Sequence, residues 1–183
     1  QQGIGLVIHA PELFASDHTL DLCTLDESYR QHSIAELQRV INISKDLRNR
    51  FQCHEPVLLV TNVGGFSEHH HLNFDERKPL RDRLIQSLRH LNTSGEVEII
   101  PQTMPPFPWH FGGQRFHNLF VDTDFIRNFC EEQGMRVCLD VSHSKLACNH
   151  LHIPFRKFLD QILPFTAHLH LADARDVDGE GLQ

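Results

Sequence analysis

The chain has 183 residues, 40% of them hydrophobic and 22% charged, which is typical of a soluble globular domain able to bury a core. Its formal net charge of −7, with no Lys/Arg run, argues against nucleic acid or an anionic membrane as the main partner. Five scattered cysteines without a C-x-x-C pair, no apolar run of ~18 residues and no signal peptide indicate a single cytoplasmic domain without disulfides.

Strand-like and helix-like runs alternate along the chain. In chain order, strands are expected at residues 4–8, 57–61, 97–100, 137–139 and 167–171. Helices are expected from the capping box Ser33-Ile-Ala-Glu36, along the leucines from Leu80 to Leu91, from Asp122 to Gly134, and from Pro154 onward. This alternation predicts parallel β/α units.

The connections between these elements carry two unusual features. Residues 101–121 form a long segment that is rich in proline and aromatic residues and includes Trp109, the only tryptophan. Its length favours a functional or lid-like loop, in which Trp109 stacks on a ligand or anchors the packing. The chain also has 15 histidines, and we interpret His69-His-His71 as an exposed loop.

Two segments place chemically active side chains directly after buried strands. Asp140-x-x-His143 follows the strand at 137–139, and His168, His170 and Asp173 lie in or after the last strand, where Leu169 and Leu171 are expected to be buried. Parallel α/β sheets build their sites at this end of the strands. A carboxylate beside imidazoles suits Mn, Fe, Co or Zn, whereas the alternative is an Asp that accepts backbone hydrogen bonds and histidines that fill strand ends.

The order of the strand-end segments resembles the xylose-isomerase-like TIM barrels, which include sugar isomerases, sugar epimerases and endonuclease IV. The resemblance covers nearly all of the chain and rests on His9-Ala-Pro-Glu12, a strand ending near Asn62, Gln102-Thr-Met, Asp140-x-x-His143 and His170-Leu-Ala-Asp173. It implies a (β/α)8 barrel of which about strands 3 to 7 are present. We therefore expect residues 1–183 to be one partial TIM-barrel domain, truncated at both ends, with exposed sheet edges.

The resemblance also implies a metal site at the mouth of the barrel. Such barrels bind a divalent cation through a Glu of the fifth strand, the Asp of D-x-x-H, the His of H-L-x-D and a Glu of the eighth strand. Asp140 and His170 match, whereas Gln102 stands at the fifth-strand position and the eighth strand lies outside the sequence. Gln can offer a carbonyl oxygen, but it brings no charge and cannot act as a base. The expected cofactor is Mn, Co, Zn or Mg.

Several further residues have candidate roles. His143 is expected to be catalytic, as a ligand, acid/base or substrate contact. Candidate substrate contacts are His9, Trp109, His168 and Asp173. The alternatives are a packed imidazole for His9 and a turn-capping carboxylate for Asp173, which could instead hydrogen-bond a metal-ligating His. His168 shares its strand face with His170, one step deeper.

Two functions of different classes remain from the sequence. The first is a metal-dependent isomerase or epimerase that acts on a sugar or sugar phosphate through an enediolate. The second is a barrel that has lost catalysis and binds carbohydrate, or regulates, within a larger protein; Gln102 favours this second hypothesis. A nuclease like endonuclease IV is disfavoured because Asn62 offers no matching histidine and the chain is acidic. A homo-oligomer or a fusion to further domains is compatible with both hypotheses.

Overall fold

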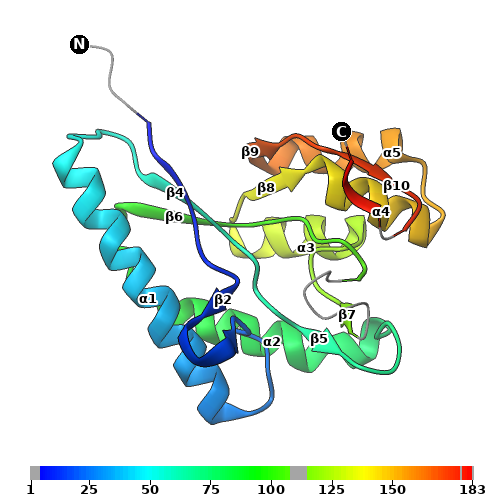
Figure 1. Cartoon of the computed structure of the whole chain (residues 1–183), viewed down its shortest axis with the longest axis horizontal. Helices are drawn as coiled ribbons and strands as arrows, with labels where there is room; N and C mark the ends of the chain where they lie inside the picture. Colours follow the sequence, from blue (N-terminus) through cyan, green and yellow to red (C-terminus); the bar gives the residue numbers. More distant parts are fainter. Residues whose placement is uncertain (1–4, 108–114, 178, 183) are drawn as a thin grey trace. The chain divides into compact units, whose positions relative to one another are not determined.

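The computed structural model describes residues 5–107, 115–177 and 179–182 of the chain (Figure 1). The described residues fall into two compact units. The first unit runs to Gly64 and resumes at residues 79–100, and the second comprises residues 65–78 and the chain from Pro101 onward. The two units are therefore interleaved in the sequence.

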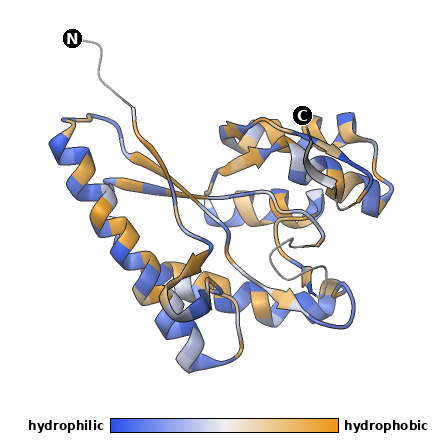
Figure 2. Cartoon of the chain, in the orientation of Figure 1, coloured by the Kyte–Doolittle hydropathy of each residue, from blue (hydrophilic) through white to orange (hydrophobic). Residues whose placement is uncertain are grey.

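The first unit is built on three strands in the order β1-β4-β6. These strands are β1 (Val7–His9), β4 (Val57–Thr61) and β6 (Val97–Pro101), and β1 pairs with β4 in parallel. A hairpin of β2 (Leu13–Phe14) and β3 (His18–Thr19), joined by η1 (Ala15–Asp17), follows β1. The unit also contains α1 (Glu27–Arg50) and most of α2 (Phe74–His90). Apolar and polar residues alternate along α1, and its apolar side buries Ile34, Leu37 and Ile41 (Figure 2).

The first helix begins seven residues earlier than the capping box predicts. Asp26 caps α1, because its side chain accepts a hydrogen bond from the backbone N–H of Tyr29 at 3.1 Å. Ser33 is buried inside the helix, where its hydroxyl lies 2.9 Å from His18 Nε2 and accepts from the backbone N–H of Asp21. The prediction that Ser33 caps the start of the helix is therefore wrong. Ser33 lies inside α1, and its hydroxyl is hydrogen-bonded to His18 of β3 and to the backbone of Asp21.

The chain beyond β4 is held tightly within the first unit. The carbonyl of Val63 accepts from the backbone N–H of Leu22 at 2.9 Å and from the thiol of Cys23 at 3.0 Å. Gly64 follows with φ +80°, and a Cβ added there would lie 2.3 Å from Asp21 Oδ1. Only glycine combines this backbone angle with so close an approach.

The second unit contains a parallel pair of strands, β8 (Val137–Asp140) and β9 (Thr166–His170). Its helices are α3 (Thr123–Gln133), α4 (Val141–Leu151), α5 (Phe155–Ile162) and η3 (Leu163–Phe165). Its short strands are β5 (Phe66–Ser67) paired with β7 (Phe116–His117), and β10 (Asp173–Arg175) paired with β11 (Gly179–Leu182). Gln102, which follows β6, forms a parallel bridge with Cys138. This bridge places Gln102 beside β8.

The expected alternation of strands and helices is confirmed, with two corrections in the second unit. α3 is capped by Asp122 and ends at Gly134 in the left-handed conformation, as predicted. α4 was not expected, and it begins directly after β8. The expected burial of Leu169 and Leu171 is wrong, since they are 45% and 77% exposed. Among the described strands β9 pairs only with β8, so it is an edge strand with fewer neighbouring side chains, and Leu171 lies beyond its last residue.

All five cysteines are buried as free thiols. Burial raises the pKa of Cys138 and Cys148 to about 12, so neither thiol is a ready nucleophile at neutral pH. Within the described part of the chain, no helix combines the length and apolar character needed to cross a membrane.

Candidate functional site

Asp140 is at the centre of the candidate site, and the local fold fixes both of its carboxylate oxygens. It is the last residue of β8 and the N-cap of α4, and it is buried. Oδ1 accepts from the backbone N–H of His143 at 2.9 Å and from the hydroxyl of Ser142 at 2.7 Å. Oδ2 lies 3.4 Å from His170 Nδ1 and 3.8 Å from His143 Nδ1. One oxygen therefore caps the helix, while the other faces the neighbouring imidazoles.

Gln102 connects the carboxylate to the end of β9. Its side-chain amide donates to Asp140 Oδ2 at 2.9 Å and lies 3.2 Å from His170 Nδ1. Because an amide nitrogen carries two hydrogens, these two contacts can form together when His170 Nδ1 is the acceptor. Gln102 is 4% exposed and the side chain of His170 is 30% exposed, so the bridge is only partly shielded from water. The amide nitrogen thus occupies the point where the carboxylate and the imidazole converge.

His143 is oriented by the backbone of residue 103. Its Nδ1 lies 2.9 Å from the carbonyl oxygen of Thr103, which can only accept, so this nitrogen carries the proton. The 3.3 Å approach of the Gln102 amide nitrogen to the same Nδ1 is then a contact between two donors. When the ring is neutral, Nε2 is therefore its acceptor nitrogen. The carbonyl fixes the tautomer in the way that ligating or catalytic histidines are commonly fixed.

A carboxylate oxygen of Asp140 and an imidazole nitrogen of His170 are chemically suitable ligands for a divalent cation. Two ligand atoms that share a cation at ~2.1 Å stand roughly 3.0–3.5 Å apart, and Asp140 Oδ2 and His170 Nδ1 are 3.4 Å apart. In the described part of the chain, however, no three His, Cys, Asp or Glu side chains are arranged as a metal site. A cation at this point would take its third donor from Gln102, whose amide must turn to present its oxygen. The metal ligand set stays a prediction.

The other two candidate site residues in this region are His168, within β9, and Asp173, which follows β9. The ring of His168 packs edge-on against His170 with centroids 5.3 Å apart, on the same face of the strand, as its spacing predicts. Asp173 is exposed, accepts from Lys145 at 2.6 Å and caps the backbone N–H of Ala174. These bonds lower the pKa of Asp173. The structure thus shows the turn-capping arrangement for Asp173, and its role in substrate binding stays a prediction.

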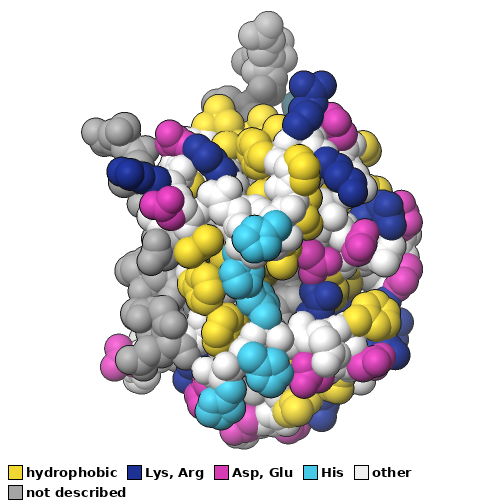
Figure 3. All heavy atoms as spheres, turned by 90° about the vertical axis from the view of Figure 1, so that its right-hand side faces the viewer, with side chains coloured by type: hydrophobic (Ala, Val, Ile, Leu, Met, Phe, Trp, Pro, Cys, Tyr) yellow, Lys and Arg dark blue, Asp and Glu magenta, His cyan; other side chains and the backbone are white. Residues whose placement is uncertain are grey.

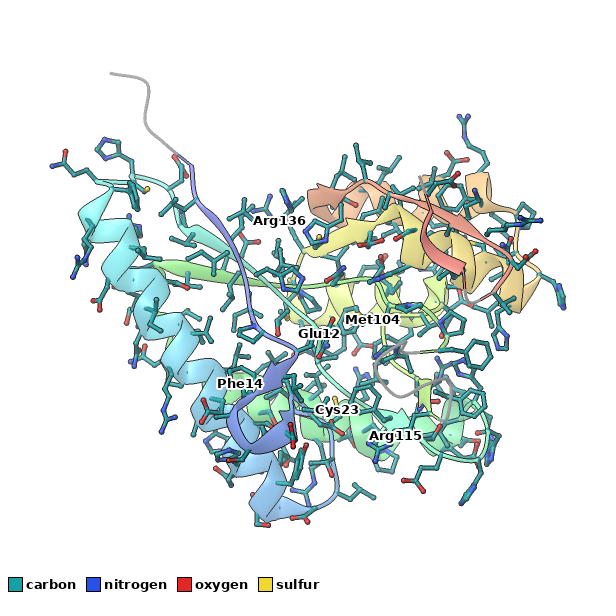
Figure 4. All side chains as sticks on the ribbon, viewed as in Figure 1. Glu12, Phe14, Cys23, Met104, Arg115 and Arg136 are labelled. Carbon is teal, nitrogen blue, oxygen red and sulfur yellow. The ribbon has the colours of Figure 1, made fainter. Side chains whose placement is uncertain are left out.

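The remaining candidate site residues, His9 and Trp109, belong to other segments of the chain. His9 ends β1 in the first unit, where its Nδ1 lies 2.7 Å from the carbonyl oxygen of Ala10. Trp109 lies outside the described residues. Met104, which precedes it, is buried after the end of β6 (Figure 4). Phe107 packs on the rings of Phe116 and His150, with centroid distances of 5.3 and 5.1 Å.

A cluster of four rings in the second unit was missed by the sequence reasoning. It consists of His71, Phe107, Phe116 and His150, with the two imidazole centroids 5.0 Å apart. Figure 3 shows histidine side chains gathered on one face of the chain. Only the abundance of histidine could have signalled this cluster, because its members come from distant segments. His71, which was expected in an exposed loop, is instead half-buried, which corrects that prediction for this one residue.

The ring cluster predicts a pH-dependent stability. Burial first, and then His150 and Arg77, lower the pKa of His71 to about 4 from an ordinary 6.5. The unfolded chain therefore binds more protons between pH 6.5 and 4, so the stability contributed by neutral His71 is present above 6.5 and is lost as the pH falls towards 4. We expect His71→Phe to flatten the loss of unfolding free energy in this window, as measured by urea titration. The exposed neighbour variant His69→Phe should leave it unchanged, and equal slopes in all three proteins would contradict the assignment.

Comparisons with known proteins agree on the fold. The model of the xylose isomerase-like TIM barrel family matches residues 1–182. The chain is similar to a D-tagatose 3-epimerase-like protein, with a TM-score of 0.68, 16% identity, and coverage of 99% of this chain and 61% of that chain. It is also similar to SacUVDE, with a TM-score of 0.57, 14% identity, and coverage of 97% and 50%. The chain thus spans between half and about three fifths of these structures. No curated protein matches the sequence significantly.

Proposed function

Since the chain belongs to the xylose isomerase-like TIM barrel family and carries an incomplete part of such a barrel, we propose that it contributes to a sugar isomerase or epimerase dependent on a divalent metal. The observation that supports this proposal is the convergence of Asp140 and His170, at 3.4 Å, on the amide of Gln102. The similar D-tagatose 3-epimerase-like structure makes a ketose, or its phosphate, the substrate class to test first. The proposal concerns the whole protein that contains this chain.

Each residue has a distinct part in the proposed reaction. Asp140 and His170 would hold the cation, with the carbonyl oxygen of Gln102 as a weaker donor. Bound there, the cation supplies Lewis-acid polarisation of an α-hydroxy carbonyl group. Gln102 cannot accept a proton from carbon, because a neutral amide is not a base. We assign this proton transfer to Nε2 of His143, since the Thr103 carbonyl fixes its other nitrogen as a donor at 2.9 Å.

Solvent exchange tests this assignment in the full-length protein. With D-tagatose or D-fructose and Mn²⁺ in D₂O, the wild type should incorporate deuterium at the carbon beside the carbonyl, as followed by NMR. His143→Gln should lose this exchange by about 100-fold or more, since a general base typically contributes 10²–10⁴-fold. His54→Gln, an exposed histidine of the first unit, is the matched control and should exchange normally. Absence of exchange in the wild type with both sugars and their phosphates would contradict the enzyme proposal.

One observation favours the carbohydrate-binding or regulatory alternative. The amide of Gln102 already satisfies the inward oxygen of Asp140 at 2.9 Å, so the described residues are stable together without a cation. A protein of this second kind would bind a ketose with the same affinity with and without Mn²⁺. It would also show no deuterium exchange under the conditions above.

A further inference from the structure

Thr103 is hydrogen-bonded to β8 and α4 through every polar atom that it has. Its backbone N–H donates to the carbonyl of Cys138 at 2.9 Å, and its carbonyl oxygen lies 2.9 Å from Nδ1 of His143. Its hydroxyl accepts from the backbone N–H of Asp140 at 2.9 Å. Thr103 is fully buried, at 0% exposure, so these bonds form away from water. It therefore acts on the candidate site only through its neighbours.

The hydroxyl of Thr103 takes the place of its own carbonyl in the pairing of the strands. Gln102 and Cys138 form a parallel bridge, in which the N–H of Thr103 donates to the carbonyl of Cys138. In a parallel ladder continued in this register, the next bond would run from the N–H of Asp140 to the carbonyl of Thr103. That N–H donates to the Thr103 hydroxyl instead. The carbonyl is thereby left for the imidazole of His143.

The hydroxyl is suited to this exchange because its other contacts fix its position. It lies 2.9 Å from the hydroxyl of Ser144 and 3.3 Å from the carbonyl of Asp140, so its hydrogen has an acceptor in either direction. Ser144 is also fully buried. Threonine is stiff at χ1, and the hydroxyls of Ser and Thr commonly compete with backbone groups for backbone hydrogen bonds. Valine has the same shape as threonine but cannot accept the N–H of Asp140.

The exchange matters for the chemistry of the site because the released carbonyl decides which nitrogen of His143 carries a proton. A carbonyl oxygen only accepts, so Nδ1 is the protonated nitrogen and Nε2 is the acceptor of the neutral ring. Without the hydroxyl, the N–H of Asp140 would be buried and unpaired. Such a group is costly enough that the carbonyl of Thr103 would return to it. His143 would then lose the acceptor that fixes its tautomer.

We propose that the hydroxyl of Thr103 is a positioning group, which selects the Nδ1-protonated tautomer of His143 by releasing the Thr103 carbonyl from the strand ladder. The acceptor nitrogen that the proposed reaction requires thus depends on a side chain that does not contact the substrate. The catalytic part of this inference rests on the proposed function, whereas the tautomer does not, so the two can fail separately. All the residues involved lie in the second unit.

Nitrogen-15 NMR of the full-length protein, labelled at histidine, tests the tautomer directly. At a pH at which the ring is neutral, the His143 resonances, assigned by their loss in His143→Gln, should show a protonated Nδ1 and an unprotonated Nε2. Thr103→Val should lose this pattern, with Nε2 protonated in part or in full, whereas Thr103→Ser should retain it. Thr166→Val is the matched control and should keep the wild-type spectrum. It removes a hydroxyl that donates to the carbonyl of Ile162 at 3.0 Å, at the end of β9 remote from His170.

The spectra also decide against the inference in defined cases. A proton on Nε2 of His143 in the neutral wild type would overturn it, and so would an unchanged tautomer in Thr103→Val. If Thr103→Val does not fold, the wild type and Thr103→Ser still test the inference, because both are expected to carry the proton on Nδ1. Loss of that pattern in Thr103→Ser would then contradict the role of the hydroxyl.

Deuterium exchange measures the catalytic part. With D-tagatose and Mn²⁺ in D₂O, Thr103→Val should lower the maximal rate of exchange beside the carbonyl by about tenfold or more, and Thr103→Ser should recover most of it. The sugar concentration that gives half the maximal rate should change little, because the substrate contacts are kept. A lost rate at an unchanged tautomer would mean a structural role and overturn the inference. A changed tautomer in a protein whose wild type shows no exchange would support the positioning role and contradict the proposed function alone.

Discussion

Gln102→Glu should bind Mn²⁺ or Co²⁺ at least about tenfold more tightly than the wild type in the full-length protein. The change places a charged oxygen where the amide nitrogen now lies, 2.9 Å from Asp140 Oδ2 and 3.2 Å from His170 Nδ1. Hard divalent cations gain most from added carboxylates, and the site is buried, so the attraction is weakly screened. Calorimetric titration with the metal measures the gain.

The same variant should be less stable than the wild type when metal is absent. Two carboxylates would face one another at the distance now occupied by a hydrogen bond, and like charges at close range repel. Added Mn²⁺ should restore its thermal midpoint. Gln86→Glu, on the exposed side of α2, makes the same chemical change away from the site and should alter neither property. If metal binding is unchanged in Gln102→Glu and also in Asp140→Ala, no metal site exists and the binding-module function replaces the enzyme.

Gly64→Ala should destabilise the protein by about 3 kcal/mol or more, as measured by chemical unfolding. Two costs add at this position. The backbone has φ +80°, which L-residues rarely adopt, and the new Cβ would lie 2.3 Å from Asp21 Oδ1 and 2.5 Å from Asp21 Cα. The second contact is with backbone, so it cannot be relieved by a side-chain rotation.

Gly95→Ala provides a control that separates the two costs. Gly95 has a similar φ of +72°, but a methyl group added there would meet nothing within 4 Å. Only the cost of the left-handed backbone remains, so a loss of about 1 kcal/mol is expected. Equal losses of unfolding free energy in the two variants would mean that the segment around Asp21 moves aside. The close contact at Gly64 would then not contribute to the destabilisation.

Most of the fold could be predicted because the strands and two of the helices carry local signals. The strand at 57–61 and the helix between Asp122 and Gly134 are found where apolar periodicity and capping residues place them. The start of α1 could not be placed correctly, because Ser33 fits a capping box equally well and its bond to His18 depends on tertiary structure. α4 was missed because Asp140 was interpreted as a metal ligand or as an acceptor of backbone hydrogen bonds, but not as the N-cap of a helix.

The candidate site was predictable in composition but not in detail. The spacing of Asp140, His143 and His170 along two strand ends was sufficient to place them together, since neighbouring parallel strands end at the same edge. The bridge made by Gln102 depends on the rotation of one amide, which a sequence does not encode locally.

The interleaving of the two units has a consequence for synthesis on the ribosome. Residues 65–78 belong to the second unit, but they emerge before residues 79–100, which complete the first. Translation proceeds at roughly 5–20 residues per second, so at least about one second passes before Pro101 is made and at least about five seconds before the rest of the second unit is made. A single proteolytic cut after residue 100 would leave the first unit whole but would separate residues 65–78 from the rest of the second unit. A nascent chain stalled soon after residue 100 has emerged would therefore display a finished first unit with a bare 65–78 segment, which is a natural target for a chaperone.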